Sequence, residues 1–130
     1  MRRKMILLTL LVLIILLIAV GCGGSAAPVD EAVLRGEELF ETGGASGIPC
    51  MSCHALDGTQ LVGPPVNGIA DVAGSRVPGQ SAEEYLRLSI TDPSDYVVEG
   101  FSDLMNKNYP DQLSEQDIDD LVAYMLTLSD

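Results

Sequence analysis

Basic residues are scarce in this chain, and several other residue types are nearly absent. The 130 residues include seven Lys and Arg against nineteen Asp and Glu, one His, no Trp and 5% aromatic residues. Three of the seven bases lie at positions 2–4, so the rest of the chain has four bases and all nineteen acids, a formal charge of −15. Phosphate backbones repel such a chain, which excludes nucleic acid as a partner. The length allows one domain and excludes most multidomain enzymes.

The hydrophobic content of 47% overstates the material available for a core. One run, Met5–Val20, is apolar throughout except for Thr9. Outside that run, six aromatic residues leave a domain of about 100 residues short of the large side chains that fill an interior. The composition therefore predicts that a group other than protein completes the core.

The N-terminus has the layout of an export signal. Bases at positions 2–4 precede the apolar run, and Gly21 and Cys22 follow it. Small residues directly before a cysteine resemble a bacterial lipobox, which implies cleavage after Gly21 and lipidation of Cys22. The alternative is an uncleaved transmembrane anchor, although a spanning helix needs about 20 apolar residues. Both interpretations place the folded part on the outer, periplasmic or extracytoplasmic, face of the cell membrane.

The chain divides into a signal or anchor (1–21), a flexible tether (22–29) and one folded domain (30–130). In the domain, Asp30 is the expected N-cap of a helix through about Glu41, and capping patterns at Ser81 and Ser114 open two more. Apolar residues after Ser114 recur at steps of three and four, which indicates an amphipathic C-terminal helix. Residues 42–80 are rich in Gly and Pro and are expected to be mostly loop. The pattern predicts an all-α fold of three to five helices joined by long loops.

Cys50-Met51-Ser52-Cys53-His54 carries the strongest chemical signal. C-x-x-C-H is the pattern of c-type haem attachment, in which two sulfurs bind one porphyrin and the following imidazole faces the iron. A zinc site would need more ligands than these three, and a redox dithiol would need a βαβ context. A disulfide between cysteines three apart closes too small a loop to stabilise much. The motif therefore predicts one covalent haem c on Cys50, Cys53 and His54.

A second axial ligand has to come from another residue type, because His54 is the only histidine. A methionine thioether is the natural choice for an electron-transfer haem, since it raises the reduction potential. The first two methionines lie in the N-terminal segment, Met51 lies inside the attachment turn, and Met125 lies in the apolar stripe of the last helix. Met105 remains, in an irregular stretch between two expected helices. The alternative is a loop methionine packed at the haem edge.

From about residue 30 to residue 130 the chain resembles class I, mono-haem cytochrome c, of the small membrane-anchored bacterial lipoprotein type. Gly36 and Phe40 are similar to a glycine and an aromatic residue of that family's N-terminal helix, and Leu121 and Tyr124 to their partners on the C-terminal helix. The resemblance implies that these helices cross, within the small cytochrome c fold wrapped around one covalent haem c.

Two further segments extend the resemblance. Gly63-Pro64 resembles the family loop whose proline carbonyl accepts a hydrogen bond from the ligand histidine, which implies that Pro64 fixes the ring of His54. Asn106 stands directly after Met105, where family members usually have proline. This departure predicts a more mobile methionine loop.

The resemblance implies an electron carrier rather than an enzyme, with no small-molecule substrate. It would relay single electrons between membrane-bound respiratory or photosynthetic complexes and contact the lipid membrane through its N-terminus. One alternative is a fixed mono-haem subunit of a quinol-oxidising complex such as alternative complex III, or of a terminal oxidase. Another is a haem sensor or peroxidase-like protein with an open iron site, although no second histidine exists to serve as a distal base.

Overall fold

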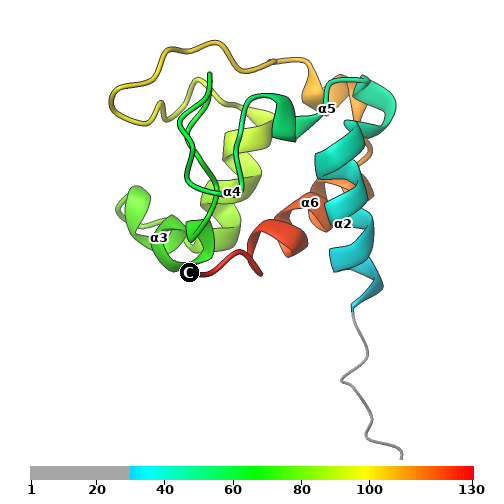
Figure 1. The fold of residues 1–130 in the computed structure, drawn as a ribbon, viewed down its shortest axis with the longest axis horizontal. Coiled ribbons are helices and arrows are strands. Elements are labelled where there is room, and N and C mark those ends of the chain that lie inside the picture. The colour runs from blue at the N-terminus through cyan, green and yellow to red at the C-terminus, as the bar shows by residue number, and fades with distance from the viewer. Residues whose placement is uncertain (1–29) are drawn as a thin grey trace, which may run out of the picture.

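The computed structural model describes residues 30–130, which form α-helices and two 3-10 turns and contain no strand (Figure 1). With the labels of Figure 1, the helices are α2 (Glu31–Thr42), α3 (Ile69–Arg76), α4 (Ala82–Thr91), α5 (Tyr109–Gln112) and α6 (Glu115–Met125), and the 3-10 turns are η1 (Gly44–Ser46) and η2 (Cys50–Ser52). The prediction of an all-α fold with three to five helices and long loops is confirmed for this part of the chain.

The expected signal, tether and lipidated Cys22 lie outside the described residues. Within residues 30–130, no helix has the length and apolar character needed to cross a bilayer.

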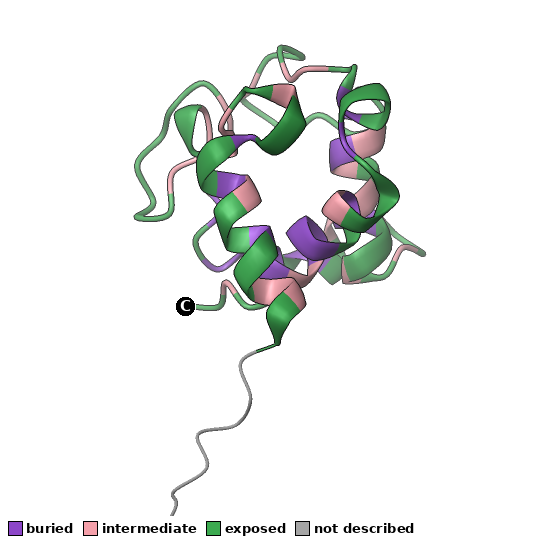
Figure 2. Cartoon of the chain, turned by 90° about the vertical axis from the view of Figure 1, so that its right-hand side faces the viewer, coloured by how far each residue is buried: buried purple, intermediate pink, exposed green. Residues whose placement is uncertain are grey.

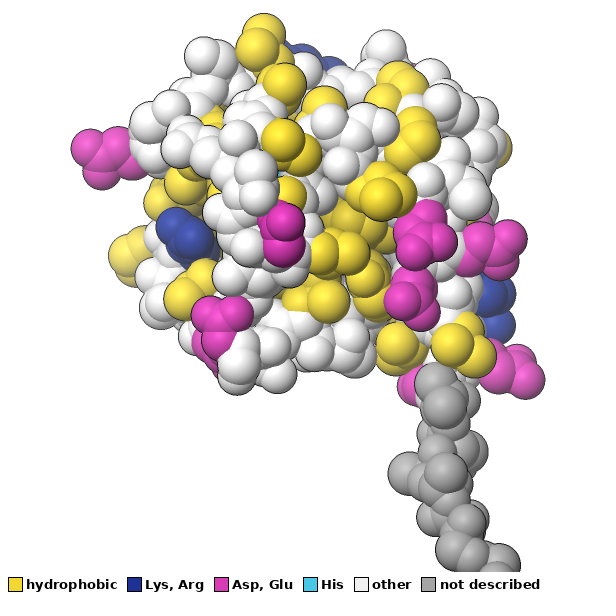
Figure 3. Space-filling view, viewed as in Figure 1, with side chains coloured by type: hydrophobic (Ala, Val, Ile, Leu, Met, Phe, Trp, Pro, Cys, Tyr) yellow, Lys and Arg dark blue, Asp and Glu magenta, His cyan; other side chains and the backbone are white. Residues whose placement is uncertain are grey.

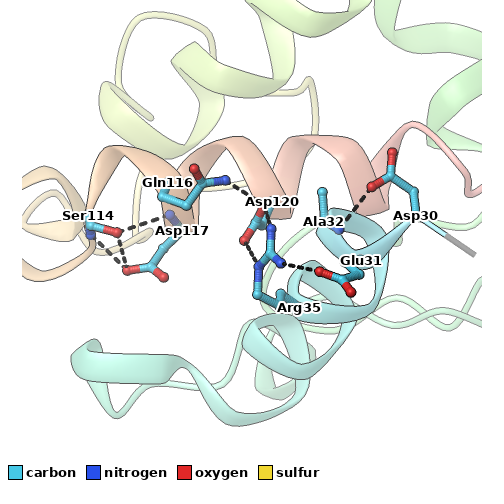
Figure 4. Close-up of polar contacts among 8 residues, drawn as sticks. All are labelled: Asp30, Glu31, Ala32, Arg35, Ser114, Gln116, Asp117 and Asp120. Carbon is cyan, nitrogen blue, oxygen red and sulfur yellow. Dashed lines mark hydrogen bonds and ion pairs between the residues drawn. The ribbon is translucent and has the colours of Figure 1, made fainter.

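The three predicted helix starts are present, because each has the side chain that a helix N-terminus requires. The Asp30 side chain accepts a hydrogen bond from the Ala32 amide at 3.0 Å, and Ser81 and Ser114 both form complete capping boxes. Figure 4 shows the bonds at Asp30 and Ser114. At its other end α2 stops at Gly43, whose φ of 78° suits glycine.

The expectation of mostly loop over residues 42–80 is wrong for α3. This helix has eight residues and begins after Gly68, which has a φ of 63° and gives no side-chain cap. Ile69 and Ala73 are its only buried residues, so its apolar pattern covers a single turn. The four-residue α5 was also not anticipated, for the same reason of length.

Helices α2 and α6 cross at a point where α2 has no side chain. A Cβ atom on Gly36 would collide with the Asp120 backbone and the Tyr124 side chain, so only glycine permits this approach. One turn along, the rings of Phe40 and Tyr124 pack with centroids 5.6 Å apart. The crossing implied by the resemblance is therefore present.

An ion pair with a buried carboxylate lies beside this crossing. Arg35 Nε donates to Asp120 Oδ2 at 2.6 Å and Gln116 Nε2 donates to Asp120 Oδ1 at 2.8 Å (Figure 4). Asp120 is buried, whereas about half of the Arg35 side chain is exposed. The pair ties the first described helix to the last one.

Buried residues lie on the inward-facing sides of the helices, around the interior of the domain (Figure 2). Helix α6 contacts both α2 and α4, and α4 contacts α3 and α5. The buried hydrophobic residues are Phe40, Val66, Ile69, Ala73, Tyr85, Leu86, Ile90, Tyr109, Leu113, Ile118, Leu121, Val122, Tyr124 and Met125. Several of these side chains also face the cavities described next.

Candidate haem site

The attachment motif follows a tight reversal of the chain after α2. A Cβ atom on Gly43 would collide with the backbone of Ile48, so the chain doubles back closely here. The motif then forms η2, in which the amides of Cys53 and His54 donate to the Cys50 carbonyl at 3.1 and 3.0 Å. This turn brings the two cysteines and the histidine to one place against the end of α2.

His54 is held by the segment that begins at Gly63. Its Nδ1 atom lies 2.8 Å from the Pro64 carbonyl oxygen, the contact that the resemblance implied. A carbonyl only accepts hydrogen bonds, so Nδ1 carries the proton and Nε2 keeps a free lone pair for a metal. The Gly63 amide donates to the Cys53 carbonyl at 2.9 Å, which binds the two segments together.

Gly63 also packs directly on the imidazole. A Cβ atom at this position would come within 2.5 Å of His54 Cε1 and 2.8 Å of Nδ1. The ring therefore occupies space that only a glycine leaves open. The sequence placed Gly63 in the right loop, but nothing in it showed this contact.

Two adjoining cavities, of about 330 and 90 Å³, open beside the motif. Both are walled by Cys50, His54 and Met105, and the larger one also by Cys53. The other walls that they share are Pro64, Tyr85, Ser89, Val98 and Tyr109. The remaining walls are mostly apolar side chains from α2, α3, α4 and α6 and from the loop after α4. The walls and the reactive motif together fit a flat, largely apolar cofactor.

One polar atom in the smaller cavity has no partner. Arg76, at the end of α3, lines this cavity, and its Nε atom is buried without a hydrogen-bond acceptor. A buried N–H donor without an acceptor is costly, and an anionic substituent on the cofactor would supply the acceptor. Haem carries such substituents as carboxylates. The attachment motif and the unpartnered Arg76 Nε atom therefore fit haem. Sequence reasoning did not identify Arg76, because no motif marks it.

Burial also shapes the ionisation of the walls. Burial raises the pKa of the Cys50 thiol to about 11, so this thiol is protonated near neutral pH. Burial likewise raises the pKa of Tyr109 to about 12, with a smaller contribution from the two cysteines. Among the described residues, no three His, Cys, Asp or Glu side chains are grouped to hold a metal ion directly. These surroundings favour a neutral thiol at Cys50 over a metal-binding thiolate.

The methionines separate by position. Met105 is partly buried on the loop between α4 and α5 and lines both cavities. Met125 is a buried core residue of α6, as expected, and also borders the smaller cavity. Met51 is 46% exposed. The geometry brings Met105 and Met125 to the cavity walls and leaves Met51 at the surface.

Comparison with known proteins agrees with this site. The sequence model of the cytochrome c family matches residues 33–129, a span that contains the attachment motif, Pro64, Arg76 and Met105. No curated protein matches the chain. The family match covers well over half of the sequence, and the motif Cys50–His54 is the family's attachment pattern. The chain belongs to the cytochrome c family and is an electron-transfer protein with covalently bound haem c.

Proposed function

We propose that the domain holds its haem iron between His54 and Met105 and shuttles single electrons at the outer face of the cytoplasmic membrane. The observation that carries the ligand assignment is that both side chains line the same two cavities, with the His54 ring already oriented by Pro64. Met105 reaches these cavities from a loop of its own, well away from the motif in sequence.

Four of the wall residues have definite tasks in this proposal. Cys50 and Cys53 would form the thioether bonds, and Nε2 of His54 would supply the proximal nitrogen. Arg76 would pair with a carboxylate of the porphyrin. When bound, the haem supplies one-electron exchange at its iron. The apolar walls exclude water and so set the reduction potential together with the axial ligands.

The visible spectrum tests the ligand assignment. The oxidised protein should show the weak charge-transfer band at the red end of the spectrum that marks a sulfur–iron bond, and Met105→Ala should remove it. Met51→Ala is the matched control and should keep the band, because that side chain is exposed at the surface. Loss of the band in Met125→Ala but not in Met105→Ala would show that the assignment is wrong.

The surface supports brief contact with redox partners. Ile48, Val62 and Leu104 line the larger cavity and are 42%, 57% and 70% exposed, so they form an apolar rim. Figure 3 shows hydrophobic side chains exposed across one face, with acidic groups both among them and at its margins. Small contacts of this kind allow rapid exchange of partners. Acidic surroundings favour basic patches on those partners.

Attachment to the membrane would be through acylated Cys22. A lipid anchor confines the domain near membrane complexes and raises its effective concentration there. Mass spectrometry of the N-terminus distinguishes acylated Cys22 from an intact Met1. The membrane fraction solubilised in mild detergent distinguishes a shuttle from a fixed subunit. If the protein migrates with a large complex, it is a subunit of a quinol-oxidising complex or terminal oxidase. If it migrates as a free monomer, the shuttle is supported.

A further inference from the structure

The residue after Met105 is fixed at both ends of its side-chain amide. Asn106 Nδ2 donates to Gln112 Oε1 at 2.8 Å, and Asn106 Oδ1 accepts from the Asn108 amide at 3.1 Å. The first bond leaves the loop and reaches α5, and the second closes a turn within the loop. Asn106 itself lines the larger cavity next to Met105.

The loop needs such bonds, because it has no regular structure between Thr91 and Tyr109. Its outer part is tied by Asp103, which accepts from Ser94 Oγ at 3.1 Å and pairs with Lys107 Nζ at 2.7 Å. These partners all belong to the loop. The bond from Asn106 differs, because Gln112 belongs to a helix.

Helix α5 is a firm point of attachment. Tyr109 is 5% exposed and Leu113, directly after the helix, is 7% exposed, so both ends of this short helix are buried in the core. Gln112 is exposed and carries its side chain on the solvent side of the same turn. The Asn106–Gln112 bond therefore connects the methionine loop to the core one residue away from the thioether.

We propose that Asn106 is a positioning residue that keeps Met105 directed at the iron through its bond to Gln112. A proline would restrict this backbone position through its ring, whereas Asn106 restrains it through two hydrogen bonds. The departure at Asn106 thus substitutes one restraint for another and does not simply loosen the loop. This inference rests on the proposed ligation by Met105.

Competition with an external ligand measures the restraint. Imidazole binds oxidised haem iron only when the methionine has left, so its apparent affinity reports the population with Met105 detached. Loss of the Asn106–Gln112 bond should raise the affinity about three- to tenfold in Gln112→Ala, and at least as much in Asn106→Ala, which also loses the bond from the Asn108 amide. The double variant should bind imidazole no more tightly than Asn106→Ala alone, because the two residues share one bond.

Two further variants separate positioning from general destabilisation. Gln112→Glu keeps an acceptor oxygen for Asn106 and should restore an affinity close to that of the unmodified protein. Gln116→Ala removes a bond of the same length to Asp120, away from the cavities, and should leave imidazole affinity unchanged. Gln112 is exposed, so its variants test the inference even if Asn106→Ala folds poorly.

The outcomes distinguish this inference from the proposal on which it rests. If Met105→Ala keeps the charge-transfer band, Met105 is not the ligand and both are overturned. If that band is lost in Met105→Ala while Asn106→Ala and Gln112→Ala bind imidazole as Gln116→Ala does, only the positioning role is overturned. Strictly additive effects in the double variant would also overturn it.

Discussion

The imidazole of His54 packs against Gly63, a residue that has no side chain. Because a Cβ atom on Gly63 would lie 2.5 Å from His54 Cε1, Gly63→Ala must push the ring or the loop aside. Either movement strains the 2.8 Å contact between Nδ1 and the Pro64 carbonyl. We expect a loss of about 1–3 kcal/mol in the free energy of unfolding, together with a changed reduction potential. Denaturant titration and redox titration of the haem-loaded protein measure both.

Gly74→Ala is the matched control for this prediction. It lies within α3, and the nearest atom to a new Cβ is 3.5 Å away, an ordinary contact. It should stabilise the helix by about 0.5–1 kcal/mol and leave the potential unchanged. Equal effects of the two alanines on the potential would contradict the role of Gly63.

Among single residues, the sequence predicted those that lie within one local motif. It missed the residue whose role depends on the tertiary fold. Cys50, Cys53 and His54 lie within one motif, so their spacing alone identifies them. Elimination among the few methionines pointed to Met105, which lines both cavities, and its bond to the iron stays a prediction. Arg76 could not be found, since only the three-dimensional fold leaves its Nε buried beside the cavity without a partner.

At the scale of elements, the crossing of α2 and α6 depends on a carboxylate. Asp120 is buried, and its hydrogen bond to Arg35 holds its pKa below the ordinary value. Its unfolded-state pKa is about 3.9, so the pair stabilises the fold above that pH. This contribution is lost as the pH falls through the lower, folded-state pKa. Asp120→Asn should therefore flatten the acid decline in stability.

Near neutral pH the same variant should lose about 1–3 kcal/mol of unfolding free energy, because a hydrogen-bonded charge is removed. Denaturant titrations at a series of acidic pH values give the free energy of unfolding as a function of pH. Glu115→Gln is the control, since this residue pairs with Arg87 through a side chain that is 87% exposed and should change stability by less than about 1 kcal/mol. The prediction would be contradicted if the free energy of unfolding fell equally steeply with decreasing pH in Asp120→Asn and in the unmodified protein.

Helices with caps and several turns of apolar periodicity could be predicted from sequence, and the short ones could not. Asp30, Ser81 and Ser114 each satisfy backbone amides at a helix start, so α2, α4 and α6 have local signals. The eight residues of α3 and four of α5 have no side-chain cap and too few turns to show a period. Tertiary packing decides their structure.

At the scale of the whole molecule, the surface field is negative because residues 30–130 contain nineteen acidic residues and only four basic ones. Arg35, Arg87 and Lys107 pair with acidic side chains, and Arg76 lies at a cavity wall. No other Lys or Arg occurs in residues 30–130. Most acidic groups therefore face solvent without a compensating charge.

This field should control the rate of electron exchange with small charged reagents. Raising the ionic strength should slow oxidation by a cationic cobalt complex severalfold and accelerate oxidation by ferricyanide, because salt screens attraction in the first case and repulsion in the second. Stopped-flow kinetics of the reduced domain give both rates. An uncharged quinone is the control, and the rate of oxidation by this reagent should depend little on ionic strength. A salt effect of the same sign for both charged reagents would contradict the prediction.

The bond between Arg35 and Asp120 joins residues 85 positions apart, so it forms only when the two ends of the domain come together. Leu121 and Met125 of α6 are walls of the smaller cavity, so this cavity lacks one side until α6 has packed. The last helix therefore completes the core and encloses the cofactor site in the same step, and unpacking of α6 would open that site.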